Sequence, residues 1–114
     1  MNRIYHNPRC GTSRSVLQTL QDRGLQVEII EYLKTPLSRA ELARLIADAG
    51  LTPRQAIREK EDIYRELGLD DPSVGDERLL DAMAEHPVLL NRPFVVTAKG
   101  TRLCRPATVI EEII

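Results

Sequence analysis

At 114 residues, the chain is long enough for one hydrophobic core and too short for two domains of ordinary size. Its 16 basic and 17 acidic residues leave a net charge of −1, so no overall field attracts nucleic acid or a membrane surface. The longest apolar runs are far too short to span a bilayer, and no signal peptide is evident. We therefore expect a single domain over residues 1–114 in the cytoplasm, with neither nucleic acid nor membrane as a partner.

The first third of the chain alternates between strand and helix patterns. Residues 3–6 and 27–32 are predicted as strands, and the second is rich in β-branched side chains. Between them, residues 13–23 have the apolar periodicity of an amphipathic helix, and Gly24 suits the left-handed position that follows a helix. This order indicates a parallel βαβ crossover.

Several short helices are expected next. Ser38 and Glu41 form a capping box that opens a helix ending at Gly50. The segment Thr52-Pro53-Arg54-Gln55 repeats that pattern with proline at the first helical position, and short helical pieces continue to Gly68. A further helix is predicted over residues 76–85, ended by Pro87.

The last part of the chain predicts strands over residues 94–97 and 101–104, joined by a hairpin turn, and a closing helix over residues 107–114. The complete order is β-α-β, a helical insertion, then β-β-α. We therefore predict an α/β protein of thioredoxin-like fold with a helical insertion between its βαβ and ββα halves. In that fold a proline before the third strand is typically cis, and Pro93 occupies its place. Sequence alone is equally consistent with an ordinary proline at the start of a strand.

Cys10 follows the first predicted strand and precedes the first helix. Unpaired N–H groups and the positive end of the helix dipole favour negative charge there, and Arg9, Arg14 and His6 are candidate cationic neighbours. We therefore expect a lowered pKa and a reactive thiolate. A lone cysteine at such a position can also be a small buried apolar residue. His6, likewise, is either a strand-end histidine with an ordinary hydrogen bond or a group that orients or charges the site.

The loop that follows the cysteine predicts an anion site. N–H groups at a helix N-terminus can hold an oxyanion, and Gly11, Thr12 and Ser13 occupy this position. Arginine outnumbers lysine by 13 to 3, and its planar fork suits bidentate recognition of oxyanions. No CxxC pair or grouping of Cys and His suggests a metal site.

With these elements in place, the chain closely resembles the glutaredoxin-coupled arsenate reductases. The matching segments span nearly its whole length and are residues 4–14, residues 32–36, Arg58, residues 86–93 with Asn91-Arg92-Pro93, and residues 100–106 with Leu103-Cys104-Arg105-Pro106. The resemblance implies that the Cys10 thiolate attacks arsenic(V), that glutathione is the cosubstrate, and that glutaredoxin is the partner protein. It implies no metal and no tightly bound cofactor.

The resemblance also implies that three arginines surround the thiol and hold arsenate. By motif position these are Arg58, Arg92 and Arg105. Taken singly, Arg58 is consistent with a solvated helix residue, and the other two with surface arginines. Three arginines around one thiol would repel one another unless an anion lay between them.

Two other functions are weighed against this one. Redox-responsive regulators of the same fold bind RNA polymerase and use a Cys-x-x-Cys switch, but Ser13 stands where the second cysteine would be. Low-molecular-weight phosphatases need Cys-x5-Arg, and Val16 stands at the arginine position. Cys104 is expected at the end of the last strand, where we predict that it shapes the site without carrying electrons.

Overall fold

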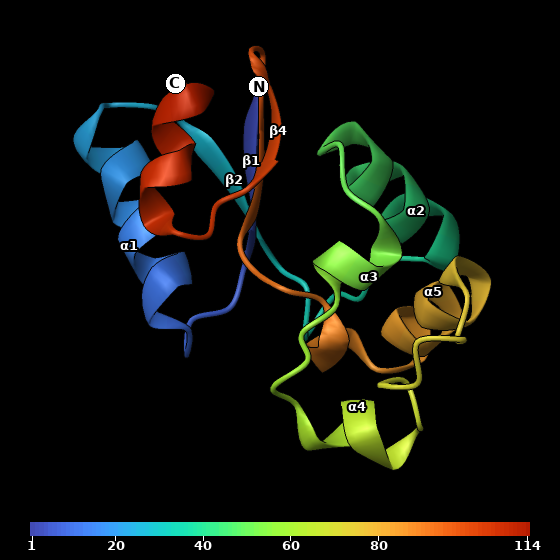
Figure 1. The fold of residues 1–114 in the computed structure, drawn as a ribbon. Helices are drawn as coiled ribbons and strands as arrows, with labels where there is room; N and C mark the ends of the chain where they lie inside the picture. Colours follow the sequence, from blue (N-terminus) through green and yellow to red (C-terminus); the bar gives the residue numbers. More distant parts are fainter. The chain divides into compact units, whose positions relative to one another are not determined.

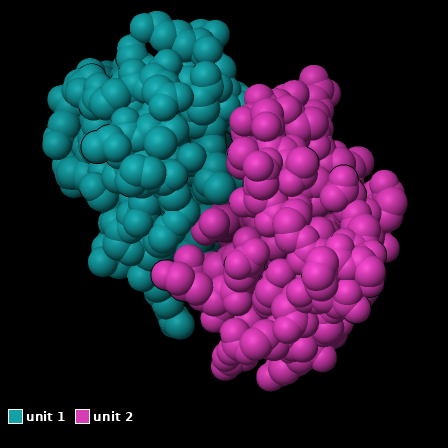
Figure 2. All heavy atoms as spheres, viewed as in Figure 1, with its two compact units in different colours: residues 1–35, 92–114 teal, residues 36–91 magenta.

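The computed structural model describes residues 1–114, and the chain divides into two compact units (Figures 1 and 2). Unit 1 consists of residues 1–35 and 92–114, and unit 2 of residues 36–91. The helical insertion predicted between the two halves of the fold is unit 2, as expected. None of the helices is long and apolar enough to cross a membrane.

Unit 1 contains a four-stranded sheet in the order β2-β1-β3-β4. Its elements are β1 (Asn2–His6), α1 (Gly11–Asp22), β2 (Val27–Glu31), β3 (Phe94–Thr97), β4 (Gly100–Leu103) and the 3₁₀ helix η2 (Ala107–Glu112). The central strand β1 pairs in parallel with β2 and antiparallel with β3, and β3 and β4 form an antiparallel hairpin. The predicted mixed α/β topology of the thioredoxin-like fold is confirmed.

The core of unit 1 lies where α1 and η2 pack on the sheet (Figure 1). Its side chains are at most 2% exposed, and they are Ile4, Val16, Leu20, Val95, Cys104, Ile110 and Ile113. Full burial of a Val, Leu or Ile side chain contributes about 1.5–3 kcal/mol, so these residues fix α1 against the sheet. This packing therefore also fixes the start of α1, at Gly11, relative to the sheet.

Several predicted boundaries are wrong by one or two residues. Strand β1 begins at Asn2, one residue earlier than expected, and β2 ends at Glu31, one residue short of Tyr32. Helix α1 begins at Gly11, two residues earlier than expected. Strand β4 begins one residue early because Gly100, with φ of +144°, already pairs with Thr97. The closing segment is not an α-helix to residue 114: η2 ends at Glu112 and its N–H groups bond three residues back, as from Val109 to Pro106. The β-branched run over residues 108–110 disfavours the α-helical form.

Unit 2 consists of short helices. They are α2 (Arg39–Asp48), α3 (Pro53–Ala56), α4 (Asp62–Glu66), α5 (Asp76–Glu85) and the 3₁₀ helix η1 (Pro87–Leu89), which the sequence did not predict.

Both predicted capping boxes are present. Ser38 Oγ accepts from the Glu41 N–H at 3.1 Å, while Glu41 Oε1 accepts from the Ser38 N–H at 3.0 Å. Thr52 and Gln55 repeat this exchange at the start of α3.

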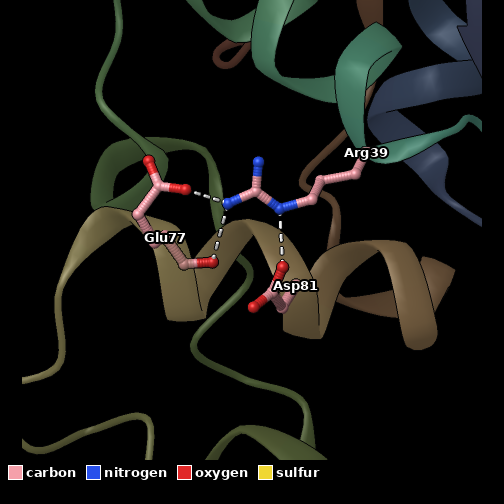
Figure 3. A network of polar contacts seen from close by, with 3 residues as sticks. All are labelled: Arg39, Glu77 and Asp81. Carbon is pink, nitrogen blue, oxygen red and sulfur yellow. Dashed lines mark hydrogen bonds and ion pairs between the residues drawn. The ribbon is translucent and has the colours of Figure 1, made fainter.

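An arginine links α2 to α5 (Figure 3). Arg39 donates from Nε to Asp81 Oδ1 at 2.6 Å and from Nη2 to the Glu77 carboxylate. The same Nη2 also donates to the Glu77 carbonyl at 3.3 Å. Because the two carboxylates stand one turn apart on α5, a single guanidinium fixes the approach of two helices whose inner faces bury Leu42, Leu45, Leu79 and Met83.

Removal of the Ser38 cap tests the capping boxes. Ser38→Ala leaves the Glu41 N–H without its acceptor, so we expect the free energy of unfolding to fall by about 1 kcal/mol in denaturant titrations. Ser15→Ala is the matched control, because Ser15 is an exposed position within α1 where alanine favours the helix. Equal effects of the two substitutions would contradict the assignment of Ser38 as a cap.

Candidate active site

Cys10 is the N-cap residue of α1. Its backbone is extended, with φ of −91° and ψ of 120°, and its carbonyl accepts the Arg14 N–H at 3.0 Å. The Ser13 N–H in the first turn hydrogen-bonds to the thiol. The residue is only 9% exposed, so the sulfur is almost out of solvent yet faces the donor end of a helix.

Two arginines from the second half of the fold reach the thiol. Arg105 Nη1 lies 3.6 Å from Cys10 Sγ and also donates to the Arg92 carbonyl at 3.0 Å. The Arg92 side chain, which is 8% exposed, hydrogen-bonds to the same sulfur. Each arginine is followed by a cis proline, at Arg92–Pro93 and Arg105–Pro106, so of the two alternatives left open for Pro93 the structure has the cis form typical of the fold.

The thiol is acidic despite its burial. Burial by itself raises the pKa of Cys10, but the Ser13 N–H and the guanidinium groups of Arg92 and Arg105 outweigh it and lower the pKa to about 7. The expectation of a lowered pKa is therefore met, with different cations from those predicted. Arg9 and Arg14 are exposed, and Arg14 Nη1 donates instead to the Pro8 carbonyl at 3.0 Å.

His6 contacts the first turn of α1 and is uncharged near neutral pH. Its Nδ1 lies 2.6 Å from Ser13 Oγ, which also accepts the Asn7 N–H at 3.1 Å. Burial lowers the pKa of His6, so the imidazole is neutral at pH 7. Since the Ser13 N–H donates to Cys10, the contact from His6 holds in place the residue that stabilises the thiolate.

Gly11 and Thr12 begin the helix immediately after the thiol. Gly11 is exposed and Thr12 is half-buried, whereas Ser13 is fully buried. N–H groups in the first turn of a helix have no partner within it, so this turn presents donors beside Cys10. The predicted anion-binding turn thus has suitable geometry.

Tyr32 is a site residue that the sequence did not reveal. It follows β2 directly, is 1% exposed, and its phenol hydrogen-bonds to the side chains of Asn7 and Arg92. Burial raises the pKa of Tyr32, so the phenol stays protonated near neutral pH. The residue belonged to a matched segment, but an aromatic at the end of an apolar strand predicts only core packing.

Arg58 lies in unit 2, whereas Cys10, Arg92 and Arg105 lie in unit 1. The Arg58 N–H donates to the Leu89 carbonyl at 2.7 Å, and the Asn91 N–H donates to the Ala56 carbonyl at 2.9 Å. These bonds flank an antiparallel bridge between residues 57 and 90. The backbone of Arg58 is thus tied to the segment that continues into Arg92.

Cys104 is a core residue. It is fully buried among the apolar side chains of unit 1, and both cysteines are free thiols. Burial raises the pKa of Cys104 to about 12, with a smaller contribution from Glu112. The two thiols therefore differ in reactivity, because only Cys10 forms a thiolate near neutral pH.

A cysteine with a lowered pKa at the first strand–helix junction of this topology, in contact with two arginines, is typical of a thioredoxin-fold protein with a reactive thiol. The ArsC family model matches residues 5–113. The chain belongs to the ArsC family.

Relatives of known structure and sequence agree with this assignment. An arsenate reductase of Rhizobium meliloti is 61% identical and one of Escherichia coli K12 is 51% identical, each over 97% of this chain and 79% of the relative. The solved structure of an arsenate reductase from Vibrio cholerae superposes with a TM-score of 0.94 at 43% identity, covering 99% of this chain and 97% of that one.

The rate at which iodoacetamide alkylates Cys10 tests the acidic thiol. Only the thiolate reacts, so the rate should rise with pH around a midpoint near 7 and then level off. Arg105→Met removes one stabilising cation and should move the midpoint upward. Mass spectrometry should find one labelled cysteine in the folded protein and two after denaturation. A midpoint at or above about 8.5, the value of a free cysteine, would contradict activation of Cys10.

Proposed function

We propose that this protein is an arsenate reductase that converts arsenate to arsenite through a covalent intermediate on Cys10. The observation that carries the proposal is the thiolate with a pKa of about 7, held between the start of α1 and the guanidinium groups of Arg92 and Arg105. A nucleophile and two forked cations at one point suit attack on the central atom of a tetrahedral oxyanion. Relatives up to 61% identical bear this name.

In the proposed reaction, Cys10 Sγ attacks arsenic(V), and one arsenate oxygen leaves as water after protonation. The result is a thiolate–arsenate adduct. Arg92 and Arg105 stabilise the charge on the remaining oxygens, together with the N–H groups of Gly11, Thr12 and Ser13. Arg58 completes the arginine set by its motif position.

The adduct is then resolved by a second thiol. Glutathione attacks, its sulfur joins Cys10 in a mixed disulfide, and the electron pair of the sulfur–arsenic bond reduces arsenic to the +3 state. Arsenite is released, and glutaredoxin returns Cys10 to the thiol. These steps need no metal and no tightly bound cofactor. A cytoplasmic location, where thiols are kept reduced, suits this chemistry.

Surrounding residues keep the nucleophile in position. His6 holds Ser13, and Tyr32 contacts Arg92, so each acts through a group that touches Cys10. Because His6 is neutral, the positive charge beside the thiolate comes from Arg92 and Arg105, and His6 contributes only its contact with Ser13.

Arginine-to-lysine variants test the oxyanion site. Arg92→Lys, Arg105→Lys and Arg58→Lys keep the charge and lose the bidentate fork. We expect kcat/KM for arsenate to fall roughly tenfold or more in each variant, equivalent to about 1.4 kcal/mol of transition-state stabilisation or more. Arg44→Lys is the control, since Arg44 is exposed on α2. Near-normal kinetics in all three variants would rule out this assignment.

The source of electrons is tested by measuring arsenite production with and without glutathione and glutaredoxin. Turnover should require both, and Cys10→Ser should abolish it. Cys104→Ala should retain activity, because Cys104 is buried among apolar side chains and its raised pKa keeps it a thiol near neutral pH. Alanine avoids burying a hydroxyl there. Trapped enzyme should carry glutathione on Cys10. Loss of turnover in Cys104→Ala, with a Cys10–Cys104 disulfide in the wild type, would instead indicate an internal relay.

A further inference from the structure

We infer that Asn7 is a positioning residue for Cys10, because it closes a ring of hydrogen bonds that holds the thiol at the first turn of α1. The ring joins Asn7, Cys10 and Ser13, and all three residues belong to unit 1. This inference deepens the proposed function and rests on it, since it concerns how the proposed nucleophile is held.

The ring consists of three hydrogen bonds that run in one direction. The Cys10 N–H donates to the Asn7 carbonyl at 3.0 Å. The Asn7 N–H donates to Ser13 Oγ at 3.1 Å, and the Ser13 N–H donates to the Cys10 thiol. Each residue therefore donates to one of the other two and accepts from the remaining one. Because the bonds share their residues, a shift of any one residue disturbs the other two.

The side chain of Asn7 fixes the turn through which the ring closes. Its Oδ1 accepts the Arg9 N–H at 2.9 Å, which is the turn that an asparagine forms with the backbone two residues further on. Pro8, with its fixed φ, is the second residue of the turn closed by the Cys10 N–H. Asn7 is only 4% exposed, and its side chain also hydrogen-bonds to the Tyr32 phenol. Alanine at this position would keep the backbone groups of the ring and lose the side-chain oxygen that supports the turn.

The ring connects this turn to the acidity of the thiol. Burial raises the pKa of Cys10, and among the groups that lower it the Ser13 N–H has the largest effect, ahead of the two arginines. A hydrogen bond weakens steeply when its donor and acceptor are misaligned. If the turn loosens, the Cys10 sulfur moves relative to the Ser13 N–H. We therefore expect the pKa of Cys10 to rise when the Asn7 side chain is removed, although no charged group is lost.

The test measures the pH dependence of Cys10 alkylation by iodoacetamide in Asn7→Ala and in a matched control. Thr97→Ala is the control, because Thr97 Oγ1 accepts the Lys99 N–H at 3.1 Å in the same kind of turn, in the hairpin between β3 and β4. In Asn7→Ala the midpoint should rise by about half to one pH unit, which lowers the rate at pH 7 about two- to fivefold. The plateau above the midpoint should stay within about twofold of the wild type. Thr97→Ala should change neither value.

Two further measurements separate the turn from general destabilisation. Asn7→Ser should recover most of the midpoint, because a serine oxygen can accept the same N–H two residues further on. In the wild type, hydrogen exchange followed by NMR should show the Arg9 amide protected about tenfold or more, although Arg9 is an exposed residue. Asn7→Ala should remove this protection. The wild-type measurement decides whether the turn is present even if Asn7→Ala does not fold.

The outcomes that would overturn the inference are an unshifted midpoint in Asn7→Ala, an equal shift in Thr97→Ala, failure of Asn7→Ser to recover the midpoint, or an unprotected Arg9 amide in the wild type. None of these measurements uses arsenate. Failure of the wild type to make arsenite would therefore overturn the proposed function and leave the positioning of the thiol to the alkylation data.

Turnover provides the converse separation. In an active wild type, Asn7→Ala should lower kcat/KM for arsenate at pH 7 about as much as it lowers alkylation, and the loss should disappear at higher pH. An active wild type together with an unchanged pH profile in Asn7→Ala would overturn only the inference.

Discussion

Stabilisation of a negative sulfur in a nearly dry position is the constraint on which the site depends. Burial opposes the charge on Cys10, and three separate donors overcome it: the first turn of α1, Arg92 and Arg105. These donors come from the two halves of the fold, which are joined in one sheet by the pairing of β1 with β3. The sheet thus brings the start of α1 and the two arginines to the sulfur of Cys10. Stabilisation of the thiolate therefore requires an intact sheet.

Arg105 has two contacts that make this arrangement cooperative. Its Nη1 group donates to both Cys10 Sγ and the Arg92 carbonyl. Arg105, two residues after β4, therefore fixes the backbone of Arg92, two residues before β3, while it stabilises the nucleophile. Arg92 is in turn contacted by the buried phenol of Tyr32. Displacing any one of these groups alters the surroundings of the others, so their effects on catalysis should not be additive.

Local features, which depend on residues close together along the chain, were predicted correctly from the sequence. The capping boxes at Ser38 and Thr52 and the position of Cys10 at the start of a helix are local patterns, and the structure has them. The cations around the thiol are not local. Arg9 and Arg14 are close to Cys10 in sequence but are exposed, and the cations that lower its pKa are Arg92 and Arg105. These two arrive through strand pairing, which a single sequence does not encode by spacing. Only the family resemblance indicated them.

The separation of the two thiols has a consequence for oxidative damage. Peroxide attacks thiolates, so Cys10 is the target, and its sulfenic acid would normally be rescued by condensing with a neighbouring thiol. Cys104 lies in the apolar core with a pKa of about 12 and is unsuited to that role. Protection against irreversible sulfinic acid formation therefore has to come from thiols in solution, which makes the lifetime of the protein under peroxide depend on the small-molecule thiol supply of its surroundings.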